Sequence, residues 1–383
     1  MQDIYVFWDG LLPQQKERIL SAYGAIDAWF ACKRTRPSTI LTVWQGDDLC
    51  GYSLMTHDRI VIQGTIVDVA TIRAQKLVGT ANAARFVELT MTHAAAAHEE
   101  GIGIVLLDGQ TAEWAQYGFA PISYHARTTW HFRPLSSQPQ PGTVALVDAD
   151  QDFTQRMTDM LRARPTGSVD ILDWEEIEPS TWLSVTSRDG QLRAAALIEH
   201  TADSILIRRA VASDDGAASD LVDALLAQYE ATNLQVALAP THPLARMALY
   251  VGAQSTLHAA YPLSLLAGII DLPTMLSALI PAFTSRVAAS GYSDWVGGVR
   301  LEISDERAMI MLQAGVVSII DGTREAAVRM RAIELPALAQ LCFGYRSVGA
   351  LRRAGLLSCD DTELAICEVL FPSLMPVLSL FPS

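Results

Sequence analysis

The segment from Thr65 to Phe119 constrains the fold more than any other part of the chain. It begins with a β-branched run at 65–71, continues with an Ala-rich stretch at about 81–98 and then has a continuous apolar run at 102–107. β-Branched residues favour a pleated surface, and Gly101 after the Ala-rich stretch is a typical helix stop. The order strand, helix, strand predicts a parallel crossover and therefore an α/β fold with a mixed sheet.

The turn between the first strand and the helix is a candidate anion site. Lys76, Gly79 and Ala81 follow the strand in the pattern Lys-x-x-Gly-x-Ala, with Thr80 inside it. The first N–H groups of a helix are unpaired, the helix dipole favours an anion there, and glycine lets the backbone approach closely. An ordinary strand-to-helix turn would account for the same residues, so both interpretations stay open.

In this order, the segment resembles the acyl-CoA binding core of the GNAT family of N-acetyltransferases. The resemblance implies that acetyl-CoA is the co-substrate and that its thioester lies at the strand end, beside the backbone of Val69 and Thr71. It implies that the turn binds the pyrophosphate, through Lys76, Gly79, Thr80 and Ala81. Leu77 and Val78 stand where relatives usually have Gly, Arg or Lys.

The same resemblance implies which residues act as the general acid and the general base of the reaction. The run Trp114-Ala-Gln-Tyr117-Gly-Phe matches the family's Tyr-x-x-Phe-Gly motif, which puts Trp114 at the position of the general acid. An indole N–H donates a hydrogen bond but does not titrate usefully, so Tyr117 is the alternative acid. The family uses the C-terminal carboxylate as its base, here that of Ser383, with Asp108 and Glu113 as alternatives.

The chain divides into three expected units. A segment rich in Pro, Ser and Gly at 133–142 ends the first unit, so we expect domains at 1–140, 141–272 and 273–383. The second unit repeats the order of the first, with a hairpin at 191–200 and 204–212, but it has no glycine-bearing phosphate turn. It is therefore expected to be a degenerate GNAT-like domain without cofactor.

The third unit is predicted to begin with one helix at 273–290. The predicted strands lie at 298–304, 307–313, 315–321 and 327–334, and further helices at 335–343, 347–354 and 361–371. This unit resembles the sterol-carrier-like domain that follows tandem GNAT domains in the enhanced intracellular survival family. The expected fold is thus two tandem GNAT-like mixed-sheet domains and a sterol-carrier-like α+β domain.

The composition and net charge limit the kinds of molecule that the protein is expected to bind. The 383 residues carry a net charge of −14, which argues against nucleic acid and against an anionic membrane surface. The five cysteines contain no C-x-x-C pair, and the eight histidines contain no i, i+4 pair, so we expect neither a disulfide framework nor a metal site. The chain start lacks a signal-peptide pattern, and the most apolar stretch, 261–280, is broken by Asp271 and Pro273. We therefore expect a cytoplasmic protein.

The resulting functional prediction is an acetyl-CoA-dependent N-acetyltransferase acting on a small-molecule amine, in a homo-oligomer that is hexameric in the family. The main alternative is a catalytically inactive GNAT-like protein that binds or carries a small or hydrophobic ligand. An assembly scaffold is a third possibility. The identity of the acceptor does not follow from the sequence.

Overall fold

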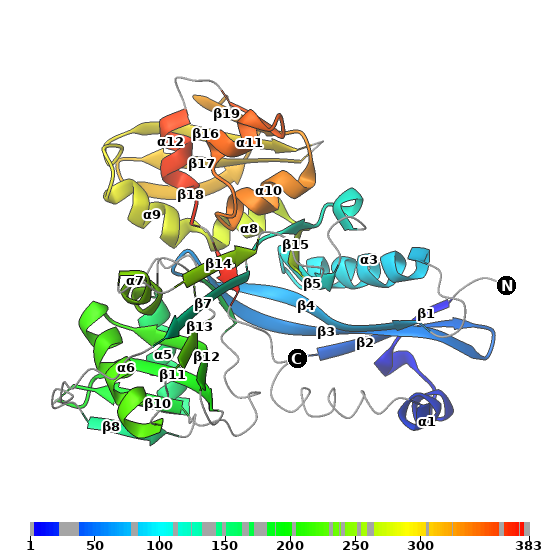
Figure 1. The fold of residues 1–383 in the computed structure, drawn as a ribbon. Coiled ribbons are helices and arrows are strands. Elements are labelled where there is room, and N and C mark those ends of the chain that lie inside the picture. Colours follow the sequence, from blue (N-terminus) through cyan, green and yellow to red (C-terminus); the bar gives the residue numbers. More distant parts are fainter. Residues whose placement is uncertain are drawn as a thin grey trace.

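Three mixed sheets and their flanking helices make up the described part of this computed structural model (Figure 1). The structure describes residues 4–22, 38–77, 83–109, 114–123, 125–131, 143–147, 151–162, 168–171, 182–187, 189–200, 204–229, 233–236, 238, 242–250, 254–258, 264–303, 306–323, 325–359, 364–374 and 376–378. The predicted α/β class with several mixed sheets is confirmed.

The first sheet has the order β1-β2-β3-β4-β5-β15-β6, with β9 and β21 attached beside β3. Its strands are β1 (Ile4–Phe7), β2 (Ser38–Gln45), β3 (Asp48–Ile62), β4 (Thr65–Leu77), β5 (Ile104–Gly109), β6 (Ala120–Pro121), β9 (Ser168–Ile171), β15 (Ser264–Ile269) and β21 (Val377–Leu378). Two helices cover opposite faces, α1 (Pro13–Ala22) and α3 (Ala83–Glu99) (Figure 1). The 3-10 turns η1 (Trp8–Gly10) and η2 (Ala115–Tyr117) complete this unit. The predicted strand, helix and strand of the crossover are confirmed.

A long hairpin of β3 and β4 runs through the first unit. Its turn consists of Gln63 and Gly64, with φ values of 58° and 81°. A two-residue turn with positive φ at both positions matches the twist of the flanking strands. The side-chain Nε2 of Gln63 donates a buried hydrogen bond of 2.7 Å to the carbonyl of Cys342 in the third unit.

The second sheet has the order β14-β7-β13-β12-β11-β10-β8. Its strands are β7 (His125–His131), β8 (Thr143–Val147), β10 (Trp182–Thr186), β11 (Leu192–His200), β12 (Ser204–Ala212), β13 (Asn233–Val236) and β14 (Gln254–His258), and its helices are α5 (Gln151–Arg162), α6 (Asp215–Tyr229) and α7 (Pro243–Tyr250). The predicted hairpin at 191–200 and 204–212 is confirmed as β11 and β12. Parallel pairing of β12 with β13 across α6 repeats the crossover of the first unit.

The first and second sheets exchange strands. β7, which follows the first unit in the sequence, pairs with β13 and β14 of the second sheet. In return, β15 lies between β5 and β6 of the first sheet, antiparallel to both. The domain limits at 140/141 and 272/273 remain a prediction, and the exchange means that each sheet contains chain from beyond its own limit.

The third sheet has the order β18-β17-β16-β19-β20. Its strands are β16 (Val296–Ile303), β17 (Glu306–Gln313), β18 (Val316–Asp321), β19 (Val328–Ala332) and β20 (Leu357–Ser358), and its helices are α8 (Leu272–Ala278), α9 (Ile280–Ala288), α10 (Leu335–Cys342), α11 (Val348–Arg353) and α12 (Leu364–Leu370). The single helix predicted at 273–290 is wrong. It divides at Leu279 because Pro281, which has no N–H to donate, begins a new helix.

The core of the third unit is continuous with that of the first. One cluster of buried side chains includes Val69 and Leu106 of the first sheet, Phe283 of α9, and Phe343 after α10. Gln340 adds a polar contact, since its Nε2 lies 3.5 Å from the carbonyl oxygen of Pro121. These two units therefore pack as one body.

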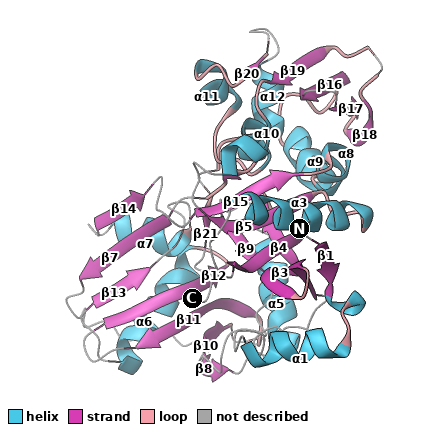
Figure 2. Ribbon diagram, turned by 90° about the vertical axis from the view of Figure 1, so that its right-hand side faces the viewer, coloured by secondary structure: helices cyan, strands magenta, loops and turns pink. Residues whose placement is uncertain are grey.

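The end of the chain returns to the first sheet. β21 pairs in parallel with β9, with Val377 opposite Ser168 and Leu378 opposite Val169 (Figure 2). β9 in turn pairs with β3 at Ile60 and Val61. The chain therefore reaches the first unit again after the third unit is complete.

Candidate functional site

β4 and β5 separate at the end of their parallel pairing. The paired residues are Ala70, Thr71 and Ile72 on β4 with Val105, Leu106 and Leu107 on β5. Beyond them β4 continues to Leu77 against β3, and β5 continues to Gly109 against β15. Among the described residues, no further pair joins β4 to β5. An opening therefore lies between two parallel strands, and backbone polar groups that face it need another partner.

A β-bulge lies where the opening begins. Met55 on β3 pairs with Ile72, and Leu54 pairs with Ala74, so Arg73 is an extra residue in β4. A bulge bends its strand and increases the local twist. The insertion of Arg73 thus explains why β4 stays paired with β3 while it leaves β5.

The sheet face towards α3 is apolar beside the opening. Trp114 is 7% exposed and packs in a cluster with Met55, Ile72 and Leu107. Its ring meets that of Phe119 edge to face, with 5.6 Å between centroids and 70° between planes. Trp114 is thus a packed wall residue, and its indole N–H can donate a hydrogen bond but does not titrate near neutral pH.

Tyr117 lies one turn further on and is more exposed. It ends η2, is 38% exposed, and places its ring 6.0 Å from that of Trp114. Gly118 follows with a φ of 89°, which turns the chain back towards Phe119. The structure thus brings together the two aromatic candidates for the acid, and only Tyr117 carries a titratable group.

The opposite face carries a buried polar group, the threonine–aspartate cluster of Thr56, Asp58 and Thr71. The hydroxyl of Thr56 donates to Asp58 Oδ2 at 3.1 Å and lies 3.4 Å from the carbonyl oxygen of Thr71. All three residues are at most 2% exposed. Thr71 Oγ1 is buried without a hydrogen-bond partner among the described residues. The cluster therefore lies next to the point where the pairing of β4 with β5 ends.

Asp58 is the functional candidate that sequence reasoning missed. It alternates with Thr56, Ile60 and Ile62 along β3, so all four occupy one face. A carboxylate on an otherwise apolar strand face that becomes buried is uncommon. That alternation was the available signal, but the hairpin partner that brings Thr71 beside it was needed to recognise the cluster.

The expected phosphate turn is shorter than predicted. We expected a turn from residue 72, yet β4 extends to Leu77, and Lys76 is a strand residue opposite Tyr52. The longer hairpin accounts for the difference, since β3 provides partners up to that point. The other predicted turn residues, Gly79, Thr80 and Ala81, lie outside the described residues.

The remaining predicted residues fall in three places. Val69 and Thr71 are buried in the middle of β4, not at its end, because the strand continues to Leu77. Thr71 pairs with Leu106 of β5, and Val69 lies just before that pairing begins. Asp108 lies on β5 opposite Leu265. Glu113 and Ser383 lie outside the described residues.

The direction of β21 is set by its register. β21 runs parallel to β9, and β9 runs antiparallel to β3, with Asp170 opposite Val61 and Ile171 opposite Ile60. A chain that follows β9 therefore advances along β3 from Val61 towards Asp58. β21, the last described strand, therefore runs in the direction from Val61 towards Asp58 when it ends at Leu378.

His93 on α3 is a buried histidine beside the site. Its Nε2 lies 3.3 Å from the carbonyl oxygen of Ser53, and its ring meets Phe7 edge to face at 5.9 Å. Burial lowers the pKa of His93 from 6.5 to about 4, although the contact with Ser53 acts in the opposite direction. The ring is therefore neutral at pH 7 and serves the packing of α3 on β3.

The described part of the chain has neither a cluster of metal-binding side chains nor a membrane-spanning helix. It contains no group of three or more His, Cys, Asp or Glu side chains placed to hold a metal ion. Within the same residues, no helix is both long and apolar enough to cross a membrane.

Several solved structures resemble this chain over its whole length. A conserved protein of unknown function from Enterococcus faecalis, described as a probable N-acyltransferase, is 14% identical with a TM-score of 0.73 over 100% of both chains. A GCN5-related N-acetyltransferase from Anabaena variabilis is 14% identical with a TM-score of 0.74 over 100% of both chains. Eis1 from Mycobacterium abscessus is 15% identical with a TM-score of 0.62, over 99% of this chain and 100% of its own.

Sequence comparison adds nothing to this, because neither a family model nor a curated protein matches the chain. The similarity therefore concerns architecture, and it extends from the first sheet to the last helices. The chain shares its fold over its whole length with solved structures that include GCN5-related N-acetyltransferases, the proteins that define the GNAT fold.

Proposed function

We propose that the protein transfers an acetyl group from acetyl-CoA to an amine. The observation that supports this most is the opening between β4 and β5, which starts at the bulge of Arg73 in a chain with the GNAT fold. The thioester of acetyl-CoA would lie in the opening. The N–H groups at Val69 and Thr71 would donate to the oxygen that becomes negative as the amine attacks.

The turn after β4 would bind the pyrophosphate. Lys76 at the end of β4 supplies charge, and Gly79, Thr80 and Ala81 lead into α3, where the helix dipole favours an anion. α3 follows at Ala83, within a few residues of that turn. Lys76, Gly79, Thr80 and Ala81 are therefore the proposed contacts to the cofactor.

The transfer step needs one proton acceptor and one proton donor. The amine nitrogen bonds to the thioester carbon, the C–S bond breaks, the nitrogen loses a proton, and the coenzyme A thiolate gains one. For the acceptor of the amine proton we propose the C-terminal carboxylate of Ser383, because β21 enters the first unit in the direction of Asp58 and Thr71.

Tyr117 is our proposed donor to the thiolate. It is partly exposed and stands beside Trp114, which occupies the family's acid position without a usable proton. Trp114 would form an apolar wall beside the thioester and orient the sulfur. A Trp114→Tyr substitution would restore the phenol of the family motif and is expected to raise kcat.

Calorimetric titration with acetyl-CoA tests the proposal. We expect saturable binding, and we expect a Lys76→Ala, Gly79→Asp double variant to lose it through reduced charge and blocked backbone approach. Gly291→Asp is the matched control, since an added Cβ there meets nothing within 4 Å. Absence of binding at millimolar acetyl-CoA would exclude the transferase, whereas binding without turnover on any amine would favour a carrier protein.

Three further assignments follow the family and stand as proposals. The third unit is sterol-carrier-like, the protein is a cytoplasmic homo-oligomer with a hexamer as the family's state, and the acceptor is a small-molecule amine. Sedimentation velocity on the full chain tests the second of these. A monomer at micromolar concentration would contradict the oligomer.

A further inference from the structure

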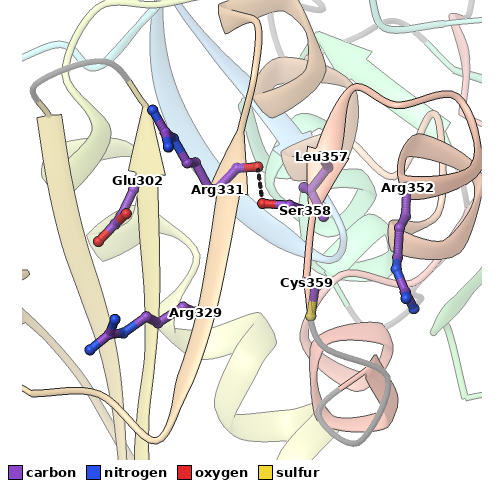
Figure 3. A pocket seen from close by; sticks show the side chains of 7 residues that line it. All are labelled: Glu302, Arg329, Arg331, Arg352, Leu357, Ser358 and Cys359. Carbon is purple, nitrogen blue, oxygen red and sulfur yellow. Dashed lines mark hydrogen bonds between the residues drawn. The ribbon is translucent and has the colours of Figure 1, made fainter.

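A cleft of about 510 Å³ lies in the third unit, away from the opening between β4 and β5. We call it the arginine cleft, and its lining residues are Glu302, Arg329, Arg331, Arg352, Leu357, Ser358 and Cys359 (Figure 3). They come from β16, β19, α11, β20 and the residue that follows β20. Its volume is within the usual range of small-molecule sites.

Strand register places the basic side chains side by side. β16 and β19 are parallel, with Arg300 opposite Arg329 and Glu302 opposite Arg331. Arg329 and Arg331 are the exposed residues of β19, while Val328 and Met330 between them are buried in the core. Both arginines therefore lie on the face of the sheet that does not contact the core (Figure 3).

The acidic residue of the cleft is already paired. Glu302 Oε1 lies 2.6 Å from Nε of Arg300, whose side chain is almost buried. Arg300 also directs Nη1 to the carbonyl of Gly322 at 3.4 Å. The guanidinium groups of Arg329 and Arg331 have no hydrogen bond or ion pair within the described part of the chain. The cleft is thus positive despite Glu302.

Positive charge is concentrated on this face of the sheet. Arg300 and Arg329 are register partners, and Glu302 compensates only Arg300. Like charges on neighbouring strands are unfavourable. The chain as a whole is acidic, with 28 Lys and Arg against 42 Asp and Glu. A concentration of arginine on one sheet face of such a chain calls for an anion to offset it.

We propose that the arginine cleft binds a small phosphorylated anion. Planar guanidinium groups suit phosphoryl oxygens, to which they donate two parallel hydrogen bonds. Arg329 and Arg331 on β19 would hold one phosphoryl group. Arg352 lies on α11, across β20 from these two arginines, so an anion with a second charged group would contact both walls (Figure 3).

Pyrophosphate is the probe for this site, and calorimetry on the full chain is the measurement. We expect one saturable event in addition to any in the first unit, and we expect it to weaken roughly tenfold or more in Arg329→Gln and Arg331→Gln, because each removes a charge-assisted pair. Arg353→Gln is the matched control on α11: it is exposed and does not line the cleft. It should leave binding unchanged.

Two comparisons distinguish binding in the arginine cleft from binding in the first unit and from general screening of charge. The Lys76→Ala, Gly79→Asp variant should retain the event, because its changes lie in the proposed coenzyme turn. Sodium chloride at matched ionic strength should not saturate the site. The proposal is overturned if Arg353→Gln weakens binding as much as Arg329→Gln, if only the coenzyme-turn variant loses it, or if citrate binds and pyrophosphate does not. Circular dichroism of each variant confirms that it is folded.

Discussion

At the scale of single residues, Asp58 illustrates how a buried carboxylate can act at a distance from a substrate. Its Oδ2 accepts from the hydroxyl of Thr56, whose oxygen lies 3.4 Å from the carbonyl oxygen of Thr71, the residue at which we place an oxyanion donor. Its role in our proposal is therefore positioning.

Substituting Asp58 should affect turnover more than cofactor binding. We expect Asp58→Ala to lower kcat by about one to two orders of magnitude through misplaced donors beside the opening, with little change in the Kd of acetyl-CoA. Asp58→Asn keeps an acceptor oxygen and should recover part of the rate. The exposed Asp68 on β4 provides the control, and Asp68→Asn should match the parent enzyme. Equal loss of binding and turnover would contradict a positioning role.

His93 predicts an acid-sensitive fold. Its pKa is about 4 in the folded chain and 6.5 ordinarily, so between these values the unfolded chain binds more protons. Neutral His93 thus contributes about 3 kcal/mol to the free energy of unfolding. This contribution is fully present above about pH 6.5 and is lost as the pH falls towards 4.

Urea unfolding at pH 7, 6 and 5 measures this loss. His93→Phe removes the titrating group, so its midpoint should change less between pH 7 and pH 5 than that of the parent. Met91 is exposed on the same helix and does not titrate, so Met91→Leu is the control and should retain the parental slope. A slope that survives in His93→Phe would assign the acid sensitivity to other groups.

At the scale of elements, the β3–β4 hairpin determines the geometry of the site. Its bulge at Arg73 moves β4 away from β5, and its turn at Gln63 contacts the end of α10. The contact is specific because Gln63 combines a left-handed φ with a side chain long enough to reach Cys342. The hairpin thus contacts the third unit at its turn and carries the bulge beside the opening.

Shortening that side chain should weaken the contact between the units. Gln63→Asn tolerates the left-handed φ but leaves the Cys342 carbonyl without its donor, which should cost about 1–3 kcal/mol of unfolding free energy. Gln313→Asn, at an exposed end of β17, is the control and should be nearly neutral. Thermal unfolding followed by calorimetry compares the two, and equal midpoints would show that the contact contributes nothing.

Element type was predictable from the sequence, whereas several boundaries and partners were not. β-Branched and Ala-rich runs predicted the crossover correctly because local composition decides there. The helix expected at 273–290 divides because the cost of Pro281 exceeds the gain from a continuous apolar stripe. Lys76 lies in a strand because β3, remote in the sequence, pairs with it. The threonine–aspartate cluster depends on the same long-range pairing, which no local pattern reveals.

At the scale of the whole molecule, the exchange of β7 and β15 makes the first two sheets interdependent. A fragment of residues 1–140 would lack β15 and therefore the strand that joins β6 to β5. Leu265 and Leu266, buried in the first sheet, would be missing. The sequence suggested separable units because the order of elements repeats, but sheet order is a property of the folded chain.

Expression of two fragments tests this interdependence. Residues 1–140 should show no cooperative thermal transition, since the edge of β5 and its apolar faces stay uncovered. Residues 270–374 contain every strand of the third sheet and should show helix and strand signals with a cooperative, though lowered, transition. Cooperative unfolding of the first fragment near the parental midpoint would contradict the prediction.

The insertion of β15 between β5 and β6 also governs the order of folding during synthesis. The ribosome makes β6 and then about 140 further residues before β15 emerges, which takes on the order of 10 s at usual elongation rates. During that interval the nascent first sheet has an open edge at β5, a surface that recruits foreign strands or chaperones. We therefore expect synonymous codon changes between residues 121 and 264 to change the yield of soluble, native protein without altering a single contact in it.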